Sequence, residues 1–391
     1  MSSPMHHAEH TRAVLAPPTI STRRTVLTLL AATIGAGALT VPRRASAADP
    51  IRLGAILPLT GPDASVGIQQ QRGLRFGVSR LNAAGGIAGR PLEILYEDDE
   101  GRPDQAIISF NKLVSLEGVP LIFSAFSGPT LAMAPLATRK KIVLVNGGAQ
   151  ADRLAKASPY LFNTIPVAAD EIAVLAKYLI SNGKKTAGIL YENDAGGSAG
   201  RNDFRAAFEQ VGGTIIGQEP VTFGQTDYRP MLLKFASSKP DVLFVMLSDG
   251  LGPLADQIYQ MKPSFLIVGT SFFNDPALLH SPGSNGWLHT QVKIKAPTAI
   301  AASFKSMFNV DMEFWGSQYS NATYIMAQAI ARVIAQKEPI TGENIRQAIF
   351  DIKTFNVMLP AVFATNTAAM EIDIARIQDA QQHVVQAIKL G

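Results

Sequence analysis

Short apolar runs alternate with longer amphipathic segments from residue 51 onward, and this alternation limits the chain to few folds. Four runs have the length and composition of buried strands: residues 51–57, 92–96, 121–123 and 142–145. The segments between them have helical spacing: residues 69–82, 104–116 and 130–139. Strands that alternate with helices predict a parallel sheet covered by helices.

The same construction begins again after residue 166. The pattern predicts helices at residues 169–181, 199–211, 228–236 and 251–261. It predicts strands at residues 186–191, 214–218, 242–247 and 265–268. We therefore expect two similar α/β lobes in tandem.

The last third of the chain differs, because helices predominate there. Helical spacing is found at residues 298–308, 318–336 and 343–352, and two β-like runs follow near 356–362 and 383–388. Helices that bring no strand of their own must pack onto an existing lobe. The chain is therefore expected to cross between the lobes several times.

Residues 1–47 have the anatomy of an export signal. Arg23 and Arg24 precede an uncharged run at 27–40, and Ala45-Ser46-Ala47 matches a signal-peptidase site. The paired arginines resemble a twin-arginine leader. The alternatives to a cleaved leader are a membrane anchor and a disordered tail, and an anchor would need about 20 apolar residues. We expect cleavage after residue 47 and a periplasmic product.

Charge and cysteine content exclude several function classes. The net charge of +4 arises in the leader, because residues 48–391 carry 30 basic and 30 acidic side chains. A balanced chain gives no argument for nucleic-acid binding. With no cysteine, the chain has no thiolate metal ligand, no cysteine nucleophile and no lipid-attachment cysteine. His280, His289 and His383 lack metal-ligand spacing, so neither metal, cofactor nor enzymatic activity is expected.

Five motifs occur in order along the first lobe. They are Leu57-Pro-Leu-Thr-Gly-Pro62, the Gly-Gly-Ile segment at 82–92, Tyr96-Glu-Asp-Asp99 with 103–106, Ser127-Gly-Pro-Thr130, and Asn146-Gly-Gly-Ala149. Together they resemble the branched-chain amino-acid type of periplasmic binding protein. The resemblance implies two Rossmann-like lobes joined by three hinge crossings, with ligand in the cleft. It places residues 48–166 and 296–354 in the first lobe, and 167–295 and 355–391 in the second.

The candidate site in the first lobe lies at the carboxyl ends of two strands. Ser127, Gly128 and Pro129 at a helix start supply a hydroxyl, free N–H groups and the positive end of the helix dipole. Helix capping by Ser127 or Thr130 is the alternative. The resemblance implies that Ser127, the position of Gln150 and the backbone of Gly148 hold a ligand carboxylate. The amide of Gln150 replaces the family's hydroxyl. Phe126, Ala149 and Val66 complete this set.

The second lobe departs from the family pattern. The resemblance implies an acidic residue after the strand at 265–268, but the positions there are Thr270-Ser271-Phe272-Phe273. Asp249 could bind an ammonium or cap the following helix, and both readings stay open. Without a fixed anion, a buried ammonium would cost several kcal/mol. We therefore hypothesise a ligand that has a carboxylate but no α-ammonium. Phe126, Phe272 and Phe273 would line the pocket for its apolar part; the alternative is that these rings belong to the hydrophobic core. Ser271 and Gly197 are further candidates.

These observations favour a solute-binding receptor that closes on a carboxylate-bearing ligand, either an aliphatic amino acid or an aromatic or branched acid. The expected partners are the membrane subunits of an ABC importer, and we expect a monomer. A sensor of the same fold that docks a regulator, and a receptor for an amide or urea, are the alternatives. The acidic run Glu97–Glu100 is expected to set local caps rather than bind metal.

Overall fold

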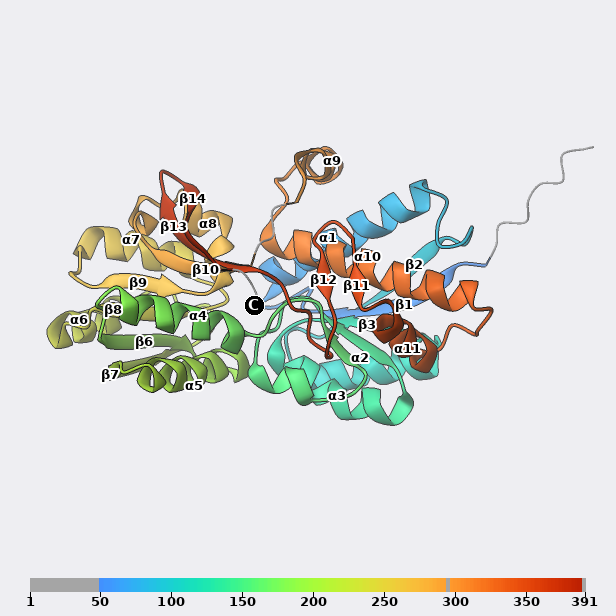
Figure 1. Ribbon diagram of the computed structural model, residues 1–391, viewed down its shortest axis with the longest axis horizontal. Helices are drawn as coiled ribbons and strands as arrows, with labels where there is room; N and C mark the ends of the chain where they lie inside the picture. Colours follow the sequence, from blue (N-terminus) through green and yellow to red (C-terminus); the bar gives the residue numbers. More distant parts are fainter. Residues whose placement is uncertain (1–48, 293–295, 389–391) are drawn as a thin grey trace, which may run out of the picture. The chain divides into compact units, whose positions relative to one another are not determined.

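The computed structural model describes residues 49–292 and 296–388, so the predicted export signal lies outside the described residues. Two principal β-sheets organise the described chain (Figure 1). No helix among the described residues is long and apolar enough to cross a bilayer. A sheet with its covering helices is called a lobe below.

The first lobe is built on a five-stranded parallel sheet with the order β2-β1-β3-β4-β5. Its strands are β1 (Ile51–Leu57), β2 (Leu92–Asp98), β3 (Leu121–Ser124), β4 (Val143–Asn146) and β5 (Leu161–Asn163). Its helices are α1 (Ala64–Ala83), α2 (Pro103–Ser115), α3 (Ser127–Lys140), α9 (Thr298–Phe308), α10 (Phe314–Ala335) and α11 (Gly342–Ile352).

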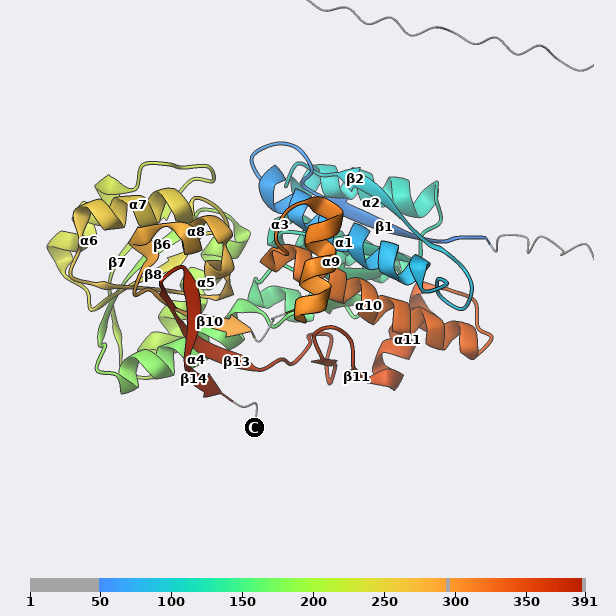
Figure 2. The ribbon, with the colours of Figure 1, turned by 90° about the horizontal axis from the view of Figure 1, so that it is seen from above.

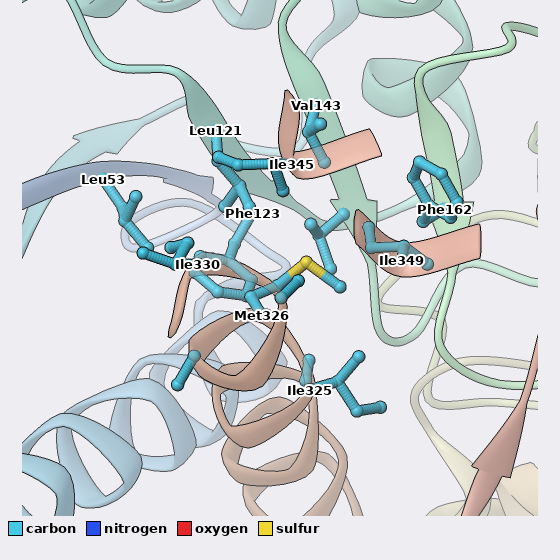
Figure 3. Close-up of a cluster of buried hydrophobic side chains, with 14 of the residues drawn as sticks. Leu53, Leu121, Phe123, Val143, Phe162, Ile325, Met326, Ile330, Ile345 and Ile349 are labelled. Carbon is cyan, nitrogen blue, oxygen red and sulfur yellow. The ribbon is translucent and has the colours of Figure 1, made fainter. Parts of the chain in front are cut away.

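Alternating side chains of the first sheet bury both of its faces. On one face, Leu53 and Phe123 contact the core formed with Met326 and Ile330 of α10 (Figure 3). On the other face, Ile122 belongs to a second cluster with side chains of α2 and α3. Burial on both faces explains why these strands are continuous apolar runs.

The second lobe is built on a seven-stranded sheet with the order β14-β13-β10-β9-β8-β6-β7. Its strands are β6 (Thr186–Glu192), β7 (Thr214–Val221), β8 (Val242–Met246), β9 (Leu266–Gly269), β10 (Leu288–Val292), β13 (Ile372–Gln378) and β14 (Gln381–Ile388). Its helices are α4 (Ala168–Ser181), α5 (Ala195–Gln210), α6 (Arg229–Ser238), α7 (Leu251–Met261) and α8 (Pro276–His280).

The chain passes between the sheets three times. It leaves β5 for α4, leaves β10 for α9, and returns to the second sheet at β13 (Figure 2). There β13 pairs antiparallel with β10 and with β14. The order of strands therefore agrees with the predicted three crossings.

Three features differ from the sequence-based expectation. The strands β5, β10 and β13 were not predicted, because β5 is short and β10 is rich in polar residues. The predicted β-like run at 356–362 is instead a hairpin of β11 (Thr354–Phe355) and β12 (Ala361–Val362). Residues between 355 and 370 also pack in the core of the first lobe, among them Phe355, Phe363 and Met370. The third crossing thus follows residue 370 rather than 354.

Candidate functional site

A cavity lined by both lobes lies at the carboxyl ends of the parallel strands, where ligands bind in open α/β sheets. About 460 Å³ of space outside the atoms, open solvent included, lies at this site. The first lobe contributes Val66, Gln70, Phe126, Ser127, Gly148, Ala149, Gln150 and Trp315. The second lobe contributes Glu192, Asp194, Gly196, Gly197, Met246, Ser248 and Phe272.

Ser127 opens α3 and lines the cavity. The residue before it, Phe126, has a φ of 54°, a left-handed conformation that is uncommon outside glycine. Neither predicted helix cap forms, since the N-cap position is Phe126 and Thr130 Oγ1 donates to Ala125 O at 3.2 Å. Ser127 Oγ accepts the N–H of Ala151 at 3.3 Å, so the hydroxyl proton is available to a ligand.

Buried Asn146 shapes the loop that follows β4. Its Oδ1 accepts the N–H groups of Gly148 at 3.0 Å and Ala149 at 2.7 Å. Its Nδ2 donates to Ala149 O and to Asn163 Oδ1. Gly148 lines the cavity, and its N–H already has a partner within the loop.

Gln150 joins the two lobes through its side chain. Its Nε2 donates to Glu171 Oε1 at 2.7 Å and to Ser271 Oγ at 3.4 Å. Glu171 is fully buried on the first turn of α4, and Ser271 follows β9. Ser271 does not line the cavity itself, but it holds the network behind Gln150.

The second lobe brings two carboxylates to the cavity that were not predicted from the sequence. Glu192 is the last residue of β6, and Asp194 is the N-cap of α5. Glu192 Oε2 accepts from the N–H and the hydroxyl of Ser248 at 3.1 and 2.6 Å. Asp194 Oδ1 accepts the N–H of Gly197 at 2.6 Å. The argument that the second lobe lacks a fixed anion is therefore wrong.

Burial and mutual repulsion shift the acidity of these groups. Desolvation raises the pKa of Glu192 to about 7, helped by the nearby carboxylates of Asp194 and Asp63. Desolvation also raises the pKa of Asp194, although its backbone hydrogen bonds oppose the shift. Among the described residues that line the cavity there is no lysine or arginine. The cavity therefore offers acceptors to a cationic or donor-bearing ligand.

An apolar wall of aromatic side chains completes the cavity. Phe126, Phe272 and Trp315 line it, together with Val66 and Met246. Phe273 does not, because its ring is fully buried and packs 5.2 Å from that of Trp287, between centroids. The alternative reading as core thus holds for Phe273 alone among the three phenylalanines.

Other predicted residues lie beside the cavity. Gly128 and Pro129 are in the first turn of α3 but do not line it. Asp249 borders a neighbouring hollow that shares Phe272 and Trp315. It does not cap α7, whose N-cap is Gly250 without a side-chain hydrogen bond.

The acidic run 97–100 behaves as expected of local caps. Asp98 Oδ1 accepts the backbone N–H groups of Leu59, Thr60 and Glu100. Among the described residues, no group of three or more acidic, histidine or cysteine side chains could hold a metal ion. This run therefore organises the loop between β1 and α1.

Several lining residues were missed: Gln70, Glu192, Asp194, Gly196, Met246, Ser248 and Trp315. Four of them, Glu192, Asp194, Gly196 and Ser248, end or follow a predicted strand, and that position was the available signal. Gln70 and Trp315 lie on long helices, where no sequence motif marks them.

The sequence matches the family described as periplasmic binding protein over residues 50–382. A curated relative, Leu/Ile/Val-binding protein homolog 3 of Brucella melitensis, is 26% identical over 263 residues. This alignment covers 66% of the present chain and 71% of the relative.

Two solved structures share the fold. A solute-binding protein of an ABC transporter from Rhodopseudomonas palustris, in complex with 3,4-dihydroxybenzoic acid, has a TM-score of 0.77 and 21% identity, covering 86% of this chain and 96% of that one. The branched-chain amino acid transporter substrate-binding protein LivJ from Streptococcus pneumoniae, in complex with isoleucine, has a TM-score of 0.76 and 20% identity, covering 87% and 100%. The predicted two-lobed α/β fold is confirmed.

Proposed function

The chain belongs to the periplasmic binding protein family, and we propose that it is an extracytoplasmic receptor that binds a small organic solute in the cavity between its lobes and delivers it to an ABC importer. The observation that carries the proposal is the cavity itself, whose wall is divided between the two lobes. A solute that contacts both lobes favours their approach, which is the basis of hinge closure in such receptors.

The lining suggests a solute with three parts. An apolar body would lie against Phe126, Phe272 and Trp315. A polar head group would lie at Ser127 and Gln150, where a hydroxyl proton and an amide are available. A cationic or donor group would face Glu192, because a buried carboxylate without a counter-charge favours one.

Aliphatic amino acids and their amides satisfy this description and are the first candidates. The name of the Brucella relative and the isoleucine complex of LivJ point the same way. Aromatic acids are the second candidates, since the aromatic wall suits a planar ring and the Rhodopseudomonas protein is in complex with a dihydroxybenzoic acid. With such a ligand, Glu192 would act as a protonated donor.

We propose that residues 1–47 direct export, and that the mature protein acts in the periplasm as a monomer with the permease subunits of an importer as partners. Replacing Arg23 and Arg24 by lysine should retain the precursor in the cytoplasm if the twin-arginine route is used. Cell fractionation with an antibody against the chain measures this. Export of the double variant at the normal rate would instead support the general secretory route.

A ligand screen by thermal shift tests the receptor function. The panel contains leucine, isoleucine, valine, isovalerate, benzoate, 3,4-dihydroxybenzoate, the primary amides of leucine, isovalerate and benzoate, and urea. A ligand at 100 times its Kd stabilises the folded state by about 2.7 kcal/mol, which raises the midpoint by a few degrees. Ser127→Ala should weaken the response, whereas Ser237→Ala, on the exposed side of α6, should not. No response to any compound would contradict the proposal.

A further inference from the structure

We propose that Gln150 is a specificity-determining residue that selects a solute with a hydrogen-bond-donating head group, a primary amide, over the matching carboxylate. This inference rests on the proposed function, because it concerns the same cavity. It also departs from the carboxylate-bearing ligand that the family resemblance implies for this position. What a ligand meets at Gln150 depends on which atom of the amide is free to bind it.

Glu171 determines the orientation of that amide. Its Oε1 accepts from Gln150 Nε2 at 2.7 Å and from Ser271 Oγ at 2.7 Å. Its Oε2 accepts from the Ser271 N–H at 2.9 Å and from Thr290 Oγ1 at 2.6 Å. Glu171 is the acceptor in all four of these hydrogen bonds, and an ionised carboxylate has no proton to donate, so the nitrogen of the Gln150 amide faces it.

The oxygen of the same amide is left without a partner. Gln150 lines the cavity and is 2% exposed, and its Oε1 is buried with no hydrogen bond to any described residue. Leaving a buried acceptor without a donor has a free-energy cost, because its lost hydration is not replaced. An N–H group of a ligand would recover this cost. A carboxylate at the same place would meet a carbonyl oxygen, with the carboxylate of Glu171 behind it.

Ser127 supplies the complementary group. Because its Oγ accepts the Ala151 N–H, its hydroxyl proton can be donated to a carbonyl oxygen of the ligand. Ser127 and Gln150 both line the cavity, and Ala151 is the next residue after Gln150. A primary amide matches this pair, with its oxygen at Ser127 and its NH₂ group at Gln150.

Gln70 provides an internal contrast. It also lines the cavity, is 2% exposed, and has a buried Oε1 without a partner. Among the described residues, however, no hydrogen bond holds its amide in one orientation. The Gln70 amide can therefore turn either atom toward a ligand, whereas the Gln150 amide cannot. Discrimination between amide and acid is assigned to Gln150 alone.

Isothermal titration calorimetry with matched pairs tests the inference. The pairs are leucinamide and leucine, isovaleramide and isovalerate, and benzamide and benzoate. For the carbon skeleton that binds best, the wild-type protein should bind the amide at least about tenfold more tightly than the acid, given the cost of an unpaired or opposed buried acceptor. Tighter binding of the acid in every pair would overturn the inference.

Two variants should shift the ratio of affinities toward the acid. In Glu171→Gln, the new side chain can donate as well as accept, which frees the Gln150 amide to turn its nitrogen to the cavity. In Gln150→Thr, a hydroxyl that can donate to the ligand replaces the amide whose orientation Glu171 determines. Far-UV circular dichroism and urea unfolding check that each variant is folded. A ratio that is unchanged in both folded variants would also overturn the inference.

Gln70→Leu is the matched control. It removes an amide of the same cavity that is not held in place, so the affinities for amide and acid should fall together and their ratio should persist. If acids bind more tightly than amides, the inference fails while the receptor function stands. If none of the six compounds binds but another solute of the thermal-shift panel does, the inference fails and the receptor function stands. If no compound of that panel binds, the receptor function fails, and the inference fails with it.

Discussion

Trp315 of α10 and Phe272 after β9 lie with their ring centroids 5.5 Å apart and their planes at 55°. One ring belongs to the first lobe and the other to the second, and both line the same cavity. Phe314 packs edge-on against the indole from the preceding position, at 4.6 Å. The environment of Trp315 therefore depends on the approach of the lobes and on the ligand.

This relationship predicts a fluorescence signal for binding. The chain has two tryptophans, and the other, Trp287, is 2% exposed in the core of the second lobe. Ligand should change the emission of the wild-type protein and of Trp287→Phe. The change should be lost in Trp315→Phe, with binding followed independently by calorimetry. A full signal in folded Trp315→Phe would contradict the assignment.

Glu192 predicts how affinity depends on pH. Its pKa, raised to about 7 mainly by burial, means that the carboxyl is mostly protonated at pH 6 and mostly ionised at pH 8. A ligand whose ammonium faces Glu192 requires the ionised form, so its affinity should rise about tenfold over this interval. An aromatic acid anion should show the opposite trend, because it requires the protonated form.

Calorimetric titrations at pH 6, 7 and 8 measure this trend. Glu192→Gln should give a flat profile for either ligand class. An ammonium-bearing ligand should bind more weakly to it, whereas an aromatic acid should keep about the affinity that it has for the wild-type protein at pH 6, because the neutral amide can donate as the protonated carboxyl does. Asp203→Asn is the control, since desolvation raises the pKa of Asp203 to about 6 but this residue does not line the cavity. A flat profile in the wild-type protein would exclude Glu192 from ligand contact.

Asp99 predicts that the protein loses stability as pH rises. Its side chain is fully buried, one oxygen accepts the Gly101 N–H at 3.0 Å, and the other has no partner among the described residues. Desolvation raises its pKa to about 7 from an ordinary value of 3.8. A carboxyl with a raised pKa stabilises the folded state while protonated, so this contribution is complete below about pH 4 and is lost as pH rises through about 7.

Urea unfolding at pH 6 and pH 8 measures the effect. Within this range each such group contributes a slope of at most about 1.4 kcal/mol per pH unit. Asp99→Asn should reduce the loss of stability between the two pH values, because an amide does not ionise. Asp104→Asn, at an exposed site beside Arg102, should leave the slope unchanged. Equal slopes in wild type and Asp99→Asn would contradict the assignment.

Gly67 in α1 is packed so closely that we expect a larger residue at this position to destabilise the fold. A Cβ at this position would collide with the carbonyl oxygen of Pro58, which follows β1. Gly67→Ala should therefore lower the free energy of unfolding by about 1–3 kcal/mol, the usual cost of overpacking. At Gly128, also helical, the nearest atom would be Pro103 Cγ at 3.4 Å, an ordinary contact. Gly128→Ala should retain stability and ligand binding. Urea unfolding of both variants distinguishes the cases.

The sequence predicted the fold well because both faces of each inner strand are buried. Continuous apolar runs such as residues 121–124 and 242–246 are recognisable without tertiary information, and turn residues mark their ends. Strands β10 and β13 were not predicted from the sequence, because they contain polar residues that are buried through contacts with particular neighbours. In β10, for example, Thr290 donates to Glu171.

The candidate site was predicted in part, through loops at strand ends. Ser127 and Gln150 were named from motifs, and the structure places both in one cavity. Glu192 was missed, since a glutamate at the end of a strand reads as a solvated residue. It is 5% exposed because Ser248, from the neighbouring strand end, covers and hydrogen-bonds it.

The two α/β lobes and the loops that would face a cleft are recognisable from the sequence alone, because strand burial and turn chemistry are local properties. Which groups those loops offer to a ligand depends on tertiary contacts. Glu171 lies 21 residues from Gln150 and 119 from Thr290, yet their hydrogen bonds determine which atom of the amide is free. Such an orientation depends on contacts between distant segments, and no local pattern encodes it.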